Sequence, residues 1–141
     1  MDPADFFVIA DRIVERWGSE AALEHVAART AVNRLYFGVL HQLRLHLSIH
    51  VPGTDVTRYH AFVKGEVRRR APSIRSWLAQ LEAYRVRADY MLGDKGMGKD
   101  AAVHARALKE AIMQEMTGDT GDGSPGVDDN DDKGLGGGRG T

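Results

Sequence analysis

The chain of 141 residues contains no cysteine and no apolar stretch long enough to cross a membrane. The missing cysteine excludes disulfide bonds, thiolate metal sites and cysteine nucleophiles. A membrane-spanning helix needs about 20 consecutive apolar residues, so we expect no membrane segment. The start, Met-Asp-Pro-Ala-Asp, also lacks the basic region of a secretory signal. The sequence therefore predicts a cytoplasmic protein.

Charge is almost balanced over the whole chain, at −1, but it is unevenly distributed. From Gly118 onward six aspartates are opposed by Lys133 and Arg139, giving −4, and the preceding 17 basic and 14 acidic residues give +3. A mildly basic body is compatible with a nucleic-acid partner without requiring one. The acidic end has no aromatic residue and cannot bury enough apolar surface to become ordered. We expect one domain over residues 1–117 and a disordered Gly/Asp-rich tail over residues 118–141.

The spacing of apolar residues predicts helices and no strand. Turn residues divide the pattern into five expected helices, at 5–17, 19–50, 55–70, 73–92 and 101–116. Ser19 and Asp100 are the expected N-caps of the second and fifth helices. The expected inward-facing residues are Phe6, Ile9, Ile13, Val14, Val32, Tyr36, Val39, Leu43, Leu47, Ile74, Trp77, Leu78, Leu81, Ala88, Val103, Leu108, Ile112 and Met116.

The second predicted helix is nearly apolar but carries Arg34 and His41, seven positions apart. At about 100° per residue, seven steps return to the same side of a helix. Ala27, Ala31, Gly38 and Leu45 share that side, opposite the expected core face. We therefore expect a shallow recess in which a cation and an imidazole bind a phosphate or perform acid–base chemistry on one.

The fourth predicted helix carries Arg85 and Asp89 at i, i+4, next to its apolar stripe. This spacing favours a structural salt bridge that holds the bundle together over a direct catalytic role. Alternatively, the carboxylate could orient the imidazole of His41. Tyr90 follows directly in the sequence and could reach the same region.

Two other clusters have both a structural and a functional interpretation. Arg68, Arg69 and Arg70 end the third predicted helix, where cations either complement the helix dipole or contact an RNA phosphate backbone. His46 and His50 have an i, i+4 spacing that can chelate zinc. No acidic ligand is evident on their face, so we expect a solvated helix end and no metal site.

Two nucleotide- or metal-binding motifs are excluded by their context. Residues 93–99 match the first seven positions of a P-loop, but Asp100 stands where magnesium binding needs Ser or Thr. The preceding segment is also predicted to be helical rather than a strand. Residues 128–132 are acidic, but their spacing does not fit a calcium loop. We expect a turn, a solvated tail and no cofactor.

Three short blocks resemble one family. Residues 34–41 read Arg-Leu-Tyr-Phe-Gly-Val-Leu-His, which resembles the Arg-x-Tyr-Tyr-Ala-x-x-His signature of HEPN domains (higher eukaryotes and prokaryotes nucleotide-binding domains). Residues 58–63 read Arg-Tyr-His-Ala-Phe-Val, similar to the next HEPN segment, in which a histidine, here His60, opens the third helix. Residues 85–90 read Arg-Val-Arg-Ala-Asp-Tyr, similar to the family's Arg-x-x-Ala-Asp-Tyr segment. The order and spacing of the blocks fit over about residues 6–116.

The resemblance implies an all-α, five-helix up-and-down bundle that forms a homodimer through its long helices. Many HEPN domains are metal-independent endoribonucleases with an Arg-x4–6-His motif in an active site shared by two protomers. In this chain Arg34, His41 and His60 would be catalytic, with Arg34 stabilising the transition state and the histidines moving protons. The supporting or structural residues would be Tyr36, Arg85, Asp89 and Tyr90.

Other HEPN domains are non-catalytic partners of minimal nucleotidyltransferases in toxin–antitoxin pairs, or RNA-binding accessories. Here Leu35 occupies the place after the arginine where catalytic motifs usually carry a polar residue. The motif therefore serves either RNA cleavage or the fold and its partners. A third interpretation is a structural helical dimer in which Arg34, His41 and Asp89 satisfy one another.

Overall fold

The computed structural model describes residues 2–17, 19, 23–53, 56–91 and 97–118, and this part of the chain contains helices, turns and no strand. A short 3₁₀ turn, Pro72–Ile74, precedes the fourth helix. The five helices are α1 (Ala4–Trp17), α2 (Glu24–His46), α3 (Val56–Arg70), α4 (Arg75–Tyr90) and α5 (Lys99–Thr117). The predicted all-helical, five-helix fold is confirmed. Beyond Gly118, the tail that was predicted to be disordered lies outside the described residues.

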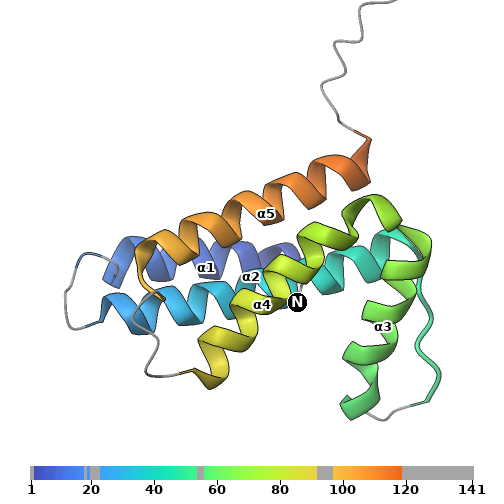
Figure 1. Cartoon of the computed structure of the whole chain (residues 1–141), viewed down its shortest axis with the longest axis horizontal. Helices are drawn as coiled ribbons and strands as arrows, with labels where there is room; N and C mark the ends of the chain where they lie inside the picture. Colours follow the sequence, from blue (N-terminus) through green and yellow to red (C-terminus); the bar gives the residue numbers. More distant parts are fainter. Residues whose placement is uncertain (1, 18, 20–22, 54–55, 92–96, 119–141) are drawn as a thin grey trace, which may run out of the picture.

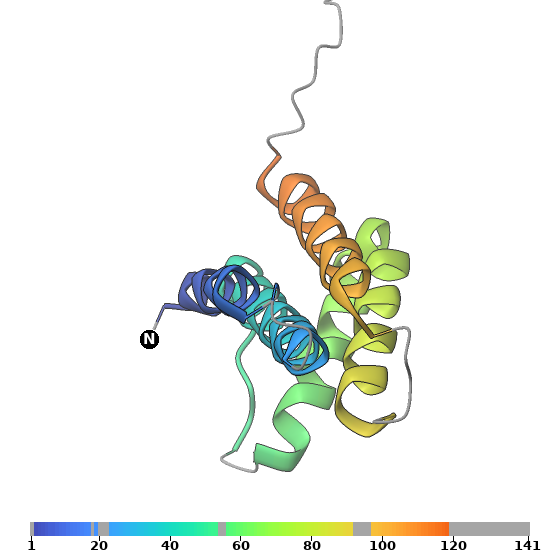
Figure 2. The ribbon, with the colours of Figure 1, turned by 90° about the vertical axis from the view of Figure 1, so that its left-hand side faces the viewer.

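The four helices α1, α2, α4 and α5 run alternately in opposite directions (Figure 1). α1 and α2 form an antiparallel pair, and α4 and α5 form a second pair beside it (Figure 2). α2 contacts each of the other four helices. α3 is steeply inclined to the bundle and extends from one end of it (Figures 1 and 2). The up-and-down topology therefore holds for α1, α2, α4 and α5, whereas α3 crosses their direction.

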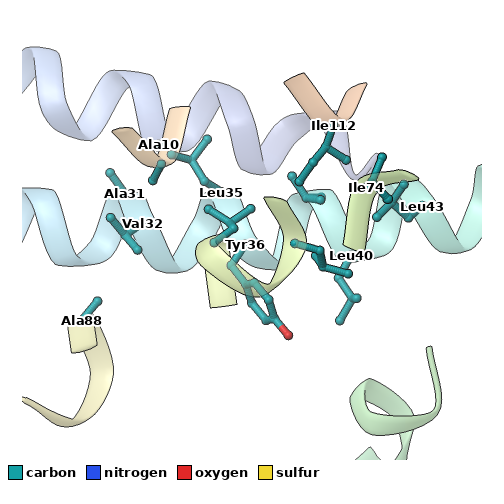
Figure 3. Close-up of a cluster of buried hydrophobic side chains, with 14 of the residues drawn as sticks. Ala10, Ala31, Val32, Leu35, Tyr36, Leu40, Leu43, Ile74, Ala88 and Ile112 are labelled. Atoms are coloured by element: carbon teal, nitrogen blue, oxygen red, sulfur yellow. The ribbon is translucent and has the colours of Figure 1, made fainter. Parts of the chain in front are cut away.

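The hydrophobic core is built around α2. Figure 3 shows Ala31, Val32 and Leu35 of this helix between side chains from the surrounding helices. Because α2 has neighbours on most sides, its residues are buried on both the expected core face and the opposite side. The buried residues of α2 are Ala27, Ala28, Ala31, Val32, Leu35, Tyr36, Gly38, Val39, Leu40 and Leu43.

The strip of small residues on α2 is the surface on which α1 packs. Ala27 and Ala31 are 3% and 1% exposed. A Cβ added to Gly38 would lie 2.9 Å from the Cβ of Phe6 and 2.6 Å from a ring carbon of Phe7. The prediction of an open recess lined by these small residues is therefore wrong, because their lack of bulk allows α1 to approach.

The buried face of α4 agrees with the prediction from apolar spacing, whereas that of α5 agrees only in part. Leu78 and Leu81 of α4 are fully buried, as expected. On α5, by contrast, Val103 is 56% exposed and Ala105 is fully buried. Alanine allows α5 to lie close to α2, so the buried side of α5 is richer in small residues than the hydrophobic spacing indicated. Ile112 is buried as predicted.

The ends of α2 differ from the prediction. The helix begins at Glu24 rather than at Ser19, and Leu23 at the N-cap makes no side-chain capping bond. It ends at His46 rather than at residue 50, because Ser48 adopts a φ of 49°. The amide of Ile49 then donates to the Arg44 carbonyl at 3.0 Å, and Ile49 is 3% exposed. This is a Schellman-type turn, which returns the chain to the core.

The first turns of α1 and α5 are capped by acidic side chains, and at α5 this is not the residue expected. The Asp2 carboxylate accepts from the Ala4 amide at 2.8 Å, and the Asp2 amide donates to the Asp5 carboxylate at 3.2 Å. At α5 the Lys99 amide donates to the Glu24 carboxylate of α2 at 3.3 Å. Asp100, the predicted cap, lies inside the first turn of α5 and is not its N-cap.

None of the helices described combines the length and the apolar character that crossing a membrane requires.

Candidate functional site

His41 and His60, two of the three predicted catalytic residues, lie next to each other. His41 is on α2 and His60 is near the start of α3, and their ring centroids are 5.9 Å apart. The Tyr59 hydroxyl lies 3.4 Å from Nδ1 of His41. Both imidazoles are partly exposed. The inclination of α3 therefore brings together two titratable groups that are 19 positions apart in the sequence.

Aromatic rings from two helices hold the histidine pair in place. Phe6 of α1 stacks on His41 with a centroid distance of 5.7 Å. Phe37 of α2 lies 4.9 Å from the ring of His60. Because one wall of each imidazole is an apolar ring, the charged form of each histidine loses part of its hydration. Phe6 was predicted only as an inward-facing residue, because its contact with His41 depends on how α1 packs.

Three arginines surround these rings. The guanidinium of Arg34, the third predicted catalytic residue, lies 5.9 Å from the Phe6 ring. Arg44 lies 5.6 Å from the Tyr59 ring, and Arg85 lies 5.5 Å from the Phe37 ring. Each guanidinium is thus one aromatic ring away from a histidine. A surface that combines imidazoles with nearby guanidinium groups suits an anionic ligand.

Arg34 differs from the other two arginines in its partners. Its side chain is exposed, and among the described residues it forms no hydrogen bond or ion pair. Arg85 donates to Asp89 at 3.3 Å. A guanidinium that is exposed and held only against an aromatic face remains able to bind a carboxylate or phosphate with its parallel N–H groups.

The surroundings favour the neutral form of both histidines. Burial, followed by the nearby His60 and Arg44, lowers the pKa of His41 below its ordinary value of 6.5. Burial, followed by the charge of Arg85, lowers the pKa of His60 below 6.5. Nδ1 of His60 is buried without a hydrogen-bond partner, so a proton placed there would leave a donor unsatisfied. Both rings are therefore predominantly neutral at pH 7.

The predicted ion pair between Arg85 and Asp89 is present, at 3.3 Å. The Asp89 carboxylate also accepts from the side-chain amide of Asn33 at 3.1 and 3.2 Å. Among the described residues, Asp89 pairs with Arg85 and Asn33 rather than with His41, so the carboxylate does not orient the imidazole directly. The network in which Arg34, His41 and Asp89 satisfy one another is not formed.

Two tyrosines predicted to support the site have very different exposure. Tyr36 is 2% exposed, and burial together with Glu82 raises its pKa to about 12. Its ring lies 5.4 Å from the guanidinium of Arg85. Tyr90, at the end of α4, is 74% exposed and lies 6.0 Å from the same guanidinium. Tyr36 is therefore a core residue beneath Arg85, whereas Tyr90 presents its ring to solvent.

The three consecutive arginines at the end of α3 have carboxylate partners. Arg69 and Arg70 each lie 2.9 Å from Glu66, and Arg68 lies 3.2 Å from Glu82 of α4. These pairs neutralise part of the positive charge that the sequence suggested for RNA binding. Their geometry gives these cations a structural role that the helix-dipole interpretation did not include: Arg68 links α3 to α4, and Arg69 and Arg70 pair with a carboxylate within α3.

No group of three or more histidine or acidic side chains with metal-binding geometry occurs within the described ranges. His46 and His50 are both exposed. Residues 93–99, which partly match a P-loop, lie largely outside the described residues, and the segment before them is helix α4, as predicted.

Comparison of the chain with models of protein families, with curated proteins and with solved structures finds no match.

Proposed function

We propose that this chain is an RNA-interacting protein of HEPN type that cleaves RNA without a metal ion, as a component of a toxin–antitoxin or defence system. The observation that supports this proposal best is the adjacency of His41 and His60, with ring centroids 5.9 Å apart. A pair of imidazoles can act as general base and general acid in one reaction. Arg34, exposed and without a carboxylate partner among the described residues, supplies a group that can bind the phosphate.

The reaction that fits these groups is transfer of a phosphoryl group within the RNA strand. One histidine accepts the proton of the ribose 2′-OH as this oxygen attacks the adjacent phosphorus. The other histidine donates a proton to the 5′ oxygen as the P–O5′ bond breaks. The products are a 2′,3′-cyclic phosphate and a 5′-OH end. Arg34 stabilises the negative charge that develops on the phosphoryl oxygens.

The pKa values of the two histidines predict the pH dependence of this reaction. The reactive state needs one neutral and one protonated imidazole. Because burial lowers the pKa of both rings, this state is most populated below pH 6.5. We expect a bell-shaped profile with its maximum on the acid side of pH 6.5.

The test is cleavage of a mixed RNA pool by the purified full chain in excess EDTA. We expect His41→Ala and His60→Ala each to lower the rate roughly 10²–10⁴-fold, and Arg34→Ala to lower it as well. His46→Ala is the matched control, because this histidine is exposed on the same helix and outside the cluster. Cleavage that persists in all three folded variants, or that EDTA abolishes, would refute the proposal.

One observation favours a non-catalytic role, as the partner of a minimal nucleotidyltransferase or as an RNA-binding accessory. An apolar hollow of about 260 Å³ lies between α1 and α2, lined in part by Trp17, Leu23 and Val26. These side chains are 38%, 36% and 59% exposed, and exposed apolar clusters often mark protein contacts. Binding of a neighbouring nucleotidyltransferase, lost in Val26→Glu, together with no RNA cleavage, would support this alternative.

A further inference from the structure

A second candidate site borders the histidine pair. An open depression of about 520 Å³ lies between α2 and α4. Arg85 connects it to the histidines, because its guanidinium lies 6.0 Å from the Tyr90 ring and 5.5 Å from the Phe37 ring, which contacts His60. The residues lining the depression are Arg29, Thr30, Asn33, Ala88, Asp89 and Tyr90.

The polar atoms that remain free in this depression are hydrogen-bond acceptors. The Thr30 hydroxyl donates to the Val26 carbonyl at 2.8 Å, so only its lone pairs are left. The side-chain amide of Asn33 donates to Asp89, which orients the amide and leaves its carbonyl oxygen without a donor among the described residues. The Asp89 carboxylate can only accept.

The donors of Arg29 are directed away from a ligand in the depression. Its guanidinium donates to the carbonyl groups of Arg87, Ala88 and Met91 at 2.8 to 2.9 Å. These bonds cap the C-terminal end of α4. The positive charge of Arg29 nevertheless stays beside the depression, with that of Arg85 next to it, and both oppose the binding of a cationic group.

The bonds at Asp89 leave it able to accept further donors. Its contacts with Asn33 and Arg85 measure 3.1 to 3.3 Å, longer than the 2.7–2.9 Å typical of charge-assisted bonds. An ionised carboxylate has about four acceptor positions. A ligand with two adjacent N–H donors can therefore pair with this group.

The exposed ring of Tyr90 adds a flat apolar surface at the edge of the depression. Its side chain is 74% exposed, and tyrosine rings on nucleic-acid-binding surfaces stack on bases. Guanine combines a flat face with two adjacent donors, N1–H and the exocyclic amino group. Adenine, cytosine and uracil do not present this pair of donors on one edge.

We propose that this depression binds a guanine base of single-stranded RNA, with Tyr90 stacking on the base and Asp89 accepting from its N1–H and amino group. The inference rests on the proposed function, because it places a guanosine beside the phosphate that His41 and His60 would act on. Asn33 positions the carboxylate, and the positive charges of Arg29 and Arg85 favour the attached phosphate.

The test is calorimetric titration of the full chain with GMP, AMP, CMP and UMP. We expect GMP to bind at least tenfold more tightly than the other three. Asp89→Asn should remove this preference, and Tyr90→Ala should weaken the binding of GMP about tenfold. Asp11→Asn is the matched control, because Asp11 is also paired with an arginine, Arg106 at 3.0 Å, but lies on α1.

Equal affinity for the four nucleotides, or a GMP preference that survives Asp89→Asn, would overturn the inference. Tyr90→Ala keeps the test informative if Asp89→Asn disturbs α4, because the side chain of Tyr90 is mostly outside the fold. Cleavage sites mapped on the RNA pool separate the two proposals. RNA cleavage without selective GMP binding refutes only the guanine site, and selective GMP binding without cleavage refutes only the nuclease.

Discussion

Gly38 and Gly65 allow a direct test of how α1 packs on α2. Both glycines lie inside helices, where replacing Gly by Ala gains about 1 kcal/mol of helix stability. Apart from the backbone of its own helix and its two chain neighbours, nothing lies within 4 Å of the position that a Cβ at Gly65 would take. We therefore expect Gly65→Ala to raise the free energy of unfolding by up to about 1 kcal/mol.

Gly38→Ala should have the opposite effect. Its Cβ would lie 2.6 and 3.0 Å from ring carbons of Phe7 and 2.9 Å from the Cβ of Phe6. The Phe7 ring can rotate, but the Cβ of Phe6 is attached to the backbone of α1, so the helix itself must move. Overpacking of this kind costs about 1–3 kcal/mol. After the gain in helix propensity, we expect a net loss of up to about 2 kcal/mol.

Urea unfolding followed by circular dichroism measures both changes on the same scale. Opposite signs for the two glycines are the expected result, and a loss of about 1 kcal/mol corresponds to a fall in Tm of about 4 °C. Because Phe6 also stacks on His41, Gly38→Ala should slow RNA cleavage as well. If Gly38→Ala stabilises the protein as much as Gly65→Ala does, the close approach of α1 to α2 described here is wrong.

Two further predictions concern stability. The fold lowers the pKa values of His41 and His60 below 6.5, so in acid the unfolded chain binds more protons than the folded protein. The free energy of unfolding therefore has its full contribution from the neutral histidines above pH 6.5 and loses it as the pH falls through their folded-state pKa values. Urea titrations at pH 7 and pH 5 should show a smaller acid loss in the double variant His41→Gln/His60→Gln, and an equal loss would contradict this. Arg29→Met removes charged donors from three carbonyl groups at the end of α4 and should cost about 2 kcal/mol. Arg12→Met on exposed α1 surface should cost much less, and similar losses would refute the capping role.

The features that sequence reasoning predicted correctly are local ones. The end of α1 and the end of α3 were predicted to the residue, because apolar spacing and turn residues act over a few positions. The ion pair between Arg85 and Asp89 was predicted for the same reason, since residues at i, i+4 are neighbours on any helix. The end of α2 was missed, because a serine at φ 49° stands where glycine is the usual signal.

The features that were missed depend on contacts between helices. The small residues of α2 indicate that another helix or a ligand can approach closely. Only the tertiary structure shows that the neighbour is α1 of the same chain. Tyr59 follows Arg58 and precedes His60 in a block already singled out, yet its contact with His41 required the position of α3. The partnership of Asn33 with Asp89 joins residues 56 positions apart and had no signal in the sequence.

By itself the sequence determined that the chain folds into five helices and places Arg34 and His41 on one side of the second. These properties follow from the period of the α-helix, which is independent of neighbouring helices. The tertiary structure decided that the small residues on this side are covered by α1, that His60 rather than Asp89 faces His41, and that an acceptor-lined depression adjoins them. These contacts arise from the inclination of α3 and from the way the other helices pack around α2. Both bring together side chains whose positions in the sequence do not indicate that they are close in space.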